Sequence, residues 1–218
     1  RSVIDGGWVA QGPEVESFER EFAEAVGARF ACATSSGTAA LTLALEAAGV
    51  GAGDEVVTAS FSFIATANSI LARGATPVFA DIEPETYNID PAEVEKAIGP
   101  RTRAILCVHQ MGLPCDLEAI MKIAAGAGLP LVEDAACAVG ARININGEWS
   151  PIGKPHGDFA CFSFHPRKII TTGEGGMVTS KSAEGDKKIR LLRHHGMSVS
   201  DLARHGAGEV IFEDYLIA

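Results

Sequence analysis

The sequence contains no apolar run long enough to cross a bilayer. A membrane-spanning helix needs about 20 predominantly apolar residues, and charged or polar residues interrupt every stretch of that length. Residues 1–8 also lack the basic, hydrophobic and small-residue layout of a secretion signal. We therefore expect a cytoplasmic protein that does not bind a membrane.

Positive charge is also scarce. The 18 Lys and Arg residues stand against 28 Asp and Glu residues, which gives a formal net charge of −10. Proteins that bind nucleic acid usually carry a net basic surface, which replaces the counterions of the phosphates. We therefore expect no nucleic acid among the partners, and any anionic ligand must be held by local donors.

Paired cysteines are absent. The five cysteines are scattered, odd in number and without a CxxC pair: Cys32, Cys107, Cys115, Cys137 and Cys161. Disulfide-stabilised domains and thiolate metal centres have regular cysteine spacing. We therefore expect mostly buried free thiols and no metal site.

No internal repeat, low-complexity tract or long linker divides the 218 residues, so one large domain is expected. Seven short apolar or β-branched runs predict strands at residues 30–34, 55–60, 76–82, 104–109, 129–135, 158–164 and 175–180. Helix-like segments occupy residues 14–26, 36–49, 63–74, 90–99 and 116–128. Strands that are apolar on both faces and alternate with helices predict an α/β domain. Its sheet would be mainly parallel and seven-stranded, with helices on both faces.

In such sheets ligands bind beyond the carboxyl ends of the strands. After the first strand, SSGTAAL (35–41) leads into an Ala- and Leu-rich helix. Free backbone N–H groups, the helix dipole and the Thr38 hydroxyl would suit a phosphate. Simple capping of the helix by Ser35 or Ser36 is the alternative, and the stretch is neither a Walker loop nor a GxGxxG fingerprint.

The next strand ends carry aromatic rings and an acid. In SFSFIAT (60–66), Phe61 and Phe63 are each able to present a flat ring to a planar cofactor, although core packing also accounts for them. In VEDAAC (132–137), Asp134 follows an apolar strand, where a carboxylate is costly to bury without a cation. Asp134 suits a protonated ring nitrogen, and helix capping is its alternative role.

The stretch FSFHPRKIITTGEGG (162–176) places Lys168 between a strand and a glycine-rich turn. Most lysines are surface charges, but one beside a cofactor can act as an amine nucleophile. His165 is close enough in sequence to act as an acid or base, or to be merely exposed. A phosphate turn, a ring, an acid and a lysine, in this order, together indicate a pyridoxal phosphate site.

The residues resemble those of the DegT/StrS family of sugar aminotransferases, which are pyridoxal phosphate enzymes of the aspartate aminotransferase fold (fold type I). The similar stretches cover nearly the whole chain. They are residues 6–28, SSGTAALTLAL (35–45), residues 53–90, LVEDAA (131–136) and FSFHPRKIITTGEGGMV (162–178). The resemblance implies an N-terminal segment and helix at residues 1–28 and a cofactor-binding large domain at residues 29–218. The family's smaller C-terminal domain would be absent from this chain.

The resemblance also implies roles for single residues. Lys168 would form the internal aldimine and then move the proton between the carbons of cofactor and substrate. Asp134 would pair with the pyridine nitrogen, and Phe63 would stack on the ring. Three residues would hold the phosphate: Gly37, Thr38 and Ser163.

Family members commonly move an amino group from glutamate to a keto group of a nucleotide-linked deoxysugar. They work as homodimers with the cofactor near the interface. The resemblance places Gln11 near the mouth of the active site, and we also take His165 as a candidate substrate contact. The expected partners are therefore a nucleotide sugar, an amino donor and a second copy of the chain.

Cys137 departs from the family pattern. The family commonly has Gln or His at this position, so the usual contact to the cofactor's ring hydroxyl is altered or missing. Two alternatives to an aminotransferase stay open. One is a dehydratase of the same family, in which histidine typically replaces the lysine, so that Lys168 weighs against it. The other is a non-catalytic regulatory protein that keeps the fold and binds the cofactor.

Overall fold

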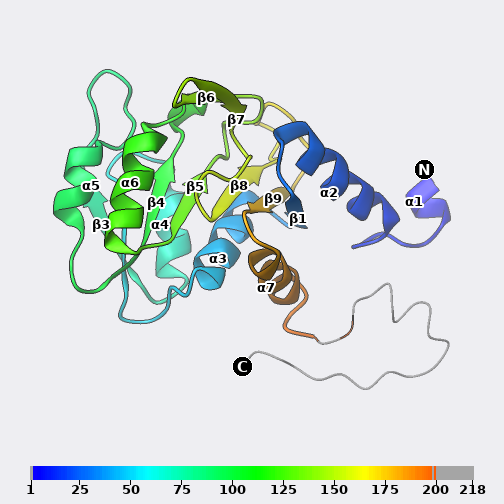
Figure 1. Ribbon diagram of the computed structural model, residues 1–218. Helices are drawn as coiled ribbons and strands as arrows, with labels where there is room; N and C mark the ends of the chain where they lie inside the picture. The colour runs from blue at the N-terminus through cyan, green and yellow to red at the C-terminus, as the bar shows by residue number, and fades with distance from the viewer. Residues whose placement is uncertain (1, 198, 200–218) are drawn as a thin grey trace.

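A seven-stranded sheet forms the centre of the molecule in the computed structural model, which describes residues 2–197 and 199 (Figure 1). The strands lie in the order β1-β9-β8-β5-β4-β2-β3. Their bounds are β1 Phe30–Thr34, β2 Glu55–Ala59, β3 Thr76–Ala80, β4 Thr102–Val108, β5 Leu131–Asp134, β8 Phe159–Ser163 and β9 Gly176–Ser180. All seven strands predicted from the sequence are present.

The sheet is mainly parallel, as predicted. β8, β5, β4, β2 and β3 pair in parallel, and β9 runs antiparallel to both of its neighbours, β8 and β1. β1 therefore has the same direction as the five parallel strands. The carboxyl ends of six strands consequently meet at one edge of the sheet.

Helices cover both faces of the sheet (Figure 1). One hydrophobic cluster includes residues of α2 (Pro13–Val26), α5 (Pro91–Ala97) and α6 (Leu117–Ala127). The other includes residues of α3 (Gly37–Ala47), α4 (Ile64–Leu71) and α7 (Ala183–Arg193). Strand residues alternate between the clusters: Val56 and Leu106 face one, whereas Val57 and Ile105 face the other. This alternation explains why the central strands are apolar throughout.

Two α-helices, a 3-10 helix at Gln110–Gly112 and two strands were not predicted from the sequence. α1 spans Ser2–Asp5, α7 follows β9, and a hairpin joins β6 (Arg142–Ile145) to β7 (Glu148–Pro151). The turn of the hairpin contains Asn146 and Gly147 with φ angles of 53° and 85°. Asn-Gly is the typical sequence of such a turn, so this signal was available in the sequence. No helix within residues 2–197 has the length and apolar character that a membrane span requires.

The outer edge of β1 is closed by side chains rather than by another strand. Glu19 of α2 is 5% exposed and accepts a hydrogen bond from the backbone N–H of Ala33 at 2.8 Å. Arg190 of α7 donates to Glu19 and to the carbonyl of Ala31, both at 2.7 Å. Arg193 donates to Glu19 and to the carbonyl of Ala33. These bonds occupy backbone groups through which an open sheet edge would pair with other chains.

We expect Glu19→Ala to lower the free energy of unfolding by about 2–3 kcal/mol. Breaking a fully buried ion pair costs roughly 3–5 kcal/mol, and the partial exposure of Arg190 reduces this value through solvent screening. Urea unfolding measures the change, with Glu21→Ala on the exposed side of the same helix as the control. Equal stability of the two variants would contradict this role of Glu19.

Candidate active site

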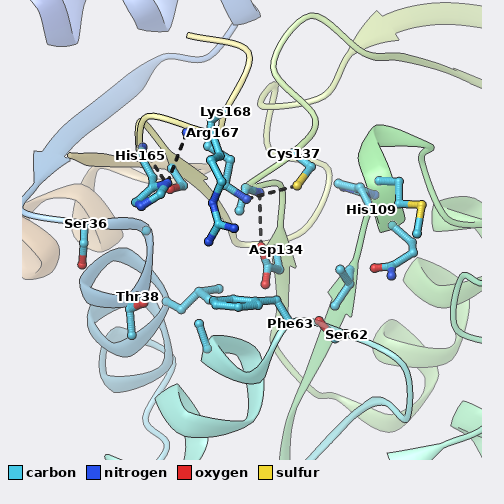
Figure 2. A pocket seen from close by; sticks show the side chains of 18 of the residues that line it. Ser36, Thr38, Ser62, Phe63, His109, Asp134, Cys137, His165, Arg167 and Lys168 are labelled. Carbon is cyan, nitrogen blue, oxygen red and sulfur yellow. Dashed lines mark hydrogen bonds between the residues drawn. The ribbon is translucent and has the colours of Figure 1, made fainter. Parts of the chain in front are cut away.

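A cavity of about 500 Å³ opens at the carboxyl ends of the strands (Figure 2). Residues that follow five strands line it: Ser36, Gly37 and Thr38 after β1, Ser62 and Phe63 after β2, His109 and Gln110 after β4, Ala136 and Cys137 after β5, and His165, Arg167 and Lys168 after β8. Segments distant in sequence thus meet where the parallel topology brings strand ends together.

The start of α3 forms one wall. Ser36 caps the helix, and its side chain accepts a hydrogen bond from the N–H of Ala39 at 3.1 Å. The cap uses only one N–H of the first turn, whose other N–H groups have no partner within the helix. The turn 35–38 therefore combines the two roles that the sequence left open, a capped helix and an anion-binding terminus.

Ser163 ends β8 beside this helix start. A Cβ atom on Gly37 would lie 2.7 Å from the Cβ of Ser163, closer than side chains tolerate. Only glycine at position 37 therefore lets the helix terminus approach the Ser163 hydroxyl. The hydroxyl also accepts a long hydrogen bond from the N–H of His165, at 3.4 Å. Hydroxyl and helix N–H groups together form a small concave site for an anion.

Only one of the two aromatic candidates after β2 lines the cavity. Phe63 lines the cavity and is 71% exposed, whereas Phe61 does not line it and packs against Tyr87 with ring centroids 5.6 Å apart. Figure 2 shows the Phe63 ring at the side of the cavity opposite Lys168. Phe63 thus has an uncovered face directed at the space where a planar ligand would lie.

Asp134 lies at the deep end of the cavity and is 6% exposed. Its carboxylate accepts hydrogen bonds from the Thr66 hydroxyl at 2.8 Å and from the N–H of Ala136 at 3.1 Å. Burial raises the pKa of the Asp134 carboxyl, and the bond from Thr66 opposes this shift in part. A cation placed against this carboxylate would remove the cost of burying its charge.

The neighbouring acid, Glu133, has a different task. It is fully buried and accepts hydrogen bonds from the N–H groups of His156 and Gly157, at 3.0 and 2.7 Å. Its other oxygen lies 3.2 Å from Nε2 of His109, whose Nδ1 accepts from the N–H of Cys115. Glu133 therefore ties together loops behind the cavity. Of the two acids that the sequence offered, only Asp134 lines the cavity.

Lys168 extends into the cavity from the turn after β8 (Figure 2). Its Nζ donates a hydrogen bond to Sγ of Cys137 at 3.1 Å. The turn is held by His165, whose carbonyl accepts from the N–H of Lys168 and whose Nδ1 accepts from the N–H of Arg167. Cys137 is exposed, whereas the other four cysteines are buried free thiols, as expected for most of them.

Gln11 is not among the residues that line the cavity, so its contact with substrate stays a prediction. The lining residues that were not proposed from the sequence include His109, Gln110, Arg167 and Glu174. His109 and Gln110 directly follow β4, so the same rule of inspecting strand ends would have found them. Within residues 2–197 and 199, no group of three His, Cys, Asp or Glu side chains is placed to hold a metal ion.

The residues of the cavity fit pyridoxal phosphate. The helix start with Ser163 offers donors to a phosphate, Phe63 offers a ring face, and the buried carboxylate of Asp134 offers a partner to a protonated ring nitrogen. Lys168 places its amine between these sites (Figure 2). The phosphate, the ring face, the ring nitrogen and the aldehyde of this cofactor thus each have a complementary group in the cavity.

The family model of DegT/DnrJ/EryC1/StrS aminotransferases matches residues 1–210. The chain belongs to this family. Pyridoxal phosphate is the cofactor of these aminotransferases. The resemblance seen in the sequence is confirmed, and so is the fold type I large domain.

Two curated relatives are similar to the chain over most of its length. The chain is 48% identical to the spore coat polysaccharide biosynthesis protein SpsC of Bacillus subtilis over 94% of its own length and 51% of that protein. It is 46% identical to GDP-perosamine synthase of Caulobacter vibrioides over 89% of its length and 51% of that protein. The chain therefore spans about half the length of the curated relatives that it matches.

A solved structure with a bound cofactor supports the fit. NtdA from Bacillus subtilis, whose structure contains the bound cofactor PMP, superposes with a TM-score of 0.83 at 34% identity. The match covers 97% of this chain and 46% of NtdA. PMP is the amino form of pyridoxal phosphate, so the matching fold accommodates the cofactor that the cavity fits.

Proposed function

We propose that the protein is the cofactor-binding part of an aminotransferase that moves an amino group, from glutamate, onto a keto group of a nucleotide-linked deoxysugar. The observation that carries this proposal is the meeting of Lys168, Asp134 and the start of α3 in one cavity. We further propose residues 1–28 as an N-terminal segment and helix and residues 29–218 as the large domain. The protein would work as a cytoplasmic homodimer.

Bound pyridoxal phosphate would supply an electron sink for the bond changes at the amino-bearing carbon. Gly37, Thr38 and Ser163 would hold the phosphate, and Phe63 would support the ring from one face. Asp134, whose burial disfavours an uncompensated charge, would keep the ring nitrogen protonated. These contacts would orient the cofactor so that its reacting carbon faces the Lys168 amine.

Lys168 would act twice, first as the amine that holds the cofactor and then as the base that moves the proton between carbons. The hydrogen bond of its Nζ to Cys137 places the amine at the wall that also carries Asp134. A dehydratase of this family typically has histidine in place of the lysine. The presence of Lys168 in the cavity therefore favours the aminotransferase.

The proposed sugar substrate is inferred from the names of the relatives. GDP-perosamine synthase carries a nucleotide-linked amino sugar in its name, and SpsC is named for polysaccharide biosynthesis. We propose the same substrate class for this chain, with His165 at the cavity wall and Gln11 as candidate contacts to the sugar nucleotide. The diphosphate of such a substrate agrees with an acidic protein that relies on local donors.

Addition of pyridoxal phosphate is expected to produce a visible absorbance band of lysine-bound cofactor, which borohydride fixes covalently to Lys168. L-glutamate should then convert the band to that of the amino form, and a nucleotide-linked keto-deoxysugar should restore it with formation of an amino sugar. Absorbance spectra and mass spectrometry of the tryptic peptides follow both steps. Borohydride labelling of other lysines alone would refute the proposal.

A further inference from the structure

We propose that Arg167 binds a carboxylate of the amino donor and so makes the enzyme selective for acidic amino acids. The inference rests on the proposed aminotransferase function and assigns a residue to its first substrate. Arg167 directly precedes Lys168 in the turn after β8 and lines the same cavity. Figure 2 shows its side chain reaching into the cavity from the same turn as Lys168.

Arg167 is exposed, and its guanidinium makes no hydrogen bond, ion pair or ring contact within residues 2–197 and 199; only its backbone N–H is bonded, to Nδ1 of His165. All other arginines in residues 2–197 make at least one such contact. Five pair with carboxylates (Arg73, Arg101, Arg103, Arg190 and Arg193), Arg20 and Arg142 donate to oxygen atoms, and Arg29 lies over the Phe30 ring. An arginine that extends into a cavity without a partner indicates a site for an anion.

The two acids of the cavity do not satisfy this charge. Asp134 is occupied by Thr66 and the N–H of Ala136. Glu174 lines the cavity but forms no ion pair with Arg167 within the described part of the chain. The guanidinium therefore stays available to a ligand.

The position of Arg167 favours a carboxylate of the donor over a phosphate of the cofactor. The anion site at the start of α3 has its donors without Arg167, namely backbone N–H groups of α3 and the Ser163 hydroxyl. The planar fork of a guanidinium matches the two oxygens of a carboxylate. As the neighbour of Lys168 in the chain, Arg167 would hold the donor with its amino group near the cofactor's reacting carbon.

Apolar side chains strengthen this charge interaction. Leu41, Phe63, Val108 and Met111 line the cavity together with Arg167. Arg167 is exposed in the ligand-free structure. A ligand seated between these walls would cover part of its side chain, so an ion pair formed there would be worth more than one at an open surface. A donor without a matching negative charge would leave the guanidinium desolvated and unpaired.

The test uses the protein loaded with pyridoxal phosphate and glutarate as probe. Glutarate has the two carboxylates of glutamate but no amino group, so it binds without reacting. Titration with glutarate, followed by the shift of the visible band, gives its dissociation constant. We expect Arg167→Gln to raise this constant roughly ten- to a hundredfold, since bonds between charged groups are lost.

Two further variants sharpen the test. Arg167→Lys keeps the charge but loses the fork, so its glutarate affinity should fall between wild type and Arg167→Gln. Arg20→Gln removes an exposed arginine of α2 and should leave the glutarate constant unchanged. The visible band itself should persist in all variants, which reports an intact cofactor site.

Other outcomes overturn the inference. Unchanged glutarate binding with weaker binding of inorganic pyrophosphate would assign Arg167 to the diphosphate of the sugar nucleotide instead. Weaker binding of pyridoxal phosphate would assign it to the cofactor. Unchanged constants for all three ligands would remove Arg167 from binding altogether. Absence of the visible band in the wild-type protein would refute the proposed function itself, and this outcome is distinct from the other three.

Discussion

Lys168→Ala is expected to abolish the visible band of bound cofactor and to reduce amino transfer more than about a thousandfold. Alanine removes both the amine that holds the cofactor and the base that moves the proton. No other lysine among the described residues lines the cavity, so no neighbouring amine takes its place. Absorbance spectra with added pyridoxal phosphate and the initial rate with glutamate and a nucleotide-linked keto-deoxysugar measure the two effects.

Lys187→Ala is the matched control, because Lys187 is an exposed residue of α7 outside the cavity. Its spectrum and rate should equal those of the wild type. Added methylamine should partly restore transfer in Lys168→Ala, since a small amine can enter the space of the missing side chain. A Lys168→Ala protein with an unchanged rate would refute the central role of this lysine.

The architecture was predictable because its signals are local. Each strand of the central sheet is a short apolar run, and the strand ends carry the small residues, acid and lysine of the site. Parallel topology then brings these ends together without further information. Asp134 and Lys168 were candidates from their positions at strand ends, whereas Phe63 was preferred to Phe61 only through the family resemblance; all three line one cavity.

Long-range pairing was not predictable in this way. Glu19 is one acid among several on an amphipathic helix, and its burial follows only from α7 packing beside β1 more than 160 residues later in the chain. Glu133 bonds the loops behind the cavity and Asp134 lines the cavity, and this difference likewise depends on which face of β5 each occupies. The sequence likewise does not show that Arg167 lacks a partner, because the partners of the other described arginines are known only from the structure.

Asp134→Asn is expected to separate stability from function. Burial raises the pKa of the Asp134 carboxyl above its ordinary value of 3.8 in the cofactor-free protein. The folded state therefore binds this proton more tightly than the unfolded state does. As pH rises from 3.8 through the raised folded-state pKa, the carboxylate ionises without a cation beside it and stability falls. Above that window the loss is complete and constant.

Asparagine removes the charge but keeps the contacts of the side chain. Its oxygen can accept from the N–H of Ala136, and its amide can donate to the Thr66 hydroxyl, which then donates to Ser62 at 2.7 Å. The cofactor-free variant should therefore melt at a higher temperature than the wild type at neutral pH, and it should lose this carboxyl's contribution to the pH dependence. Thermal melts across pH measure both effects.

Added pyridoxal phosphate should reverse the order of the two melting temperatures, so that the wild type melts above Asp134→Asn. The wild type gains stability because a protonated ring nitrogen compensates the buried carboxylate, whereas the variant gains less and transfers the amino group roughly a hundredfold more slowly. Asp116→Asn, an exposed cap of α6 that asparagine replaces equally well, is the control. A lower melting temperature of cofactor-free Asp134→Asn would show that this carboxylate stabilises the fold. A residue kept at a cost to the cofactor-free fold is instead the sign of a binding site.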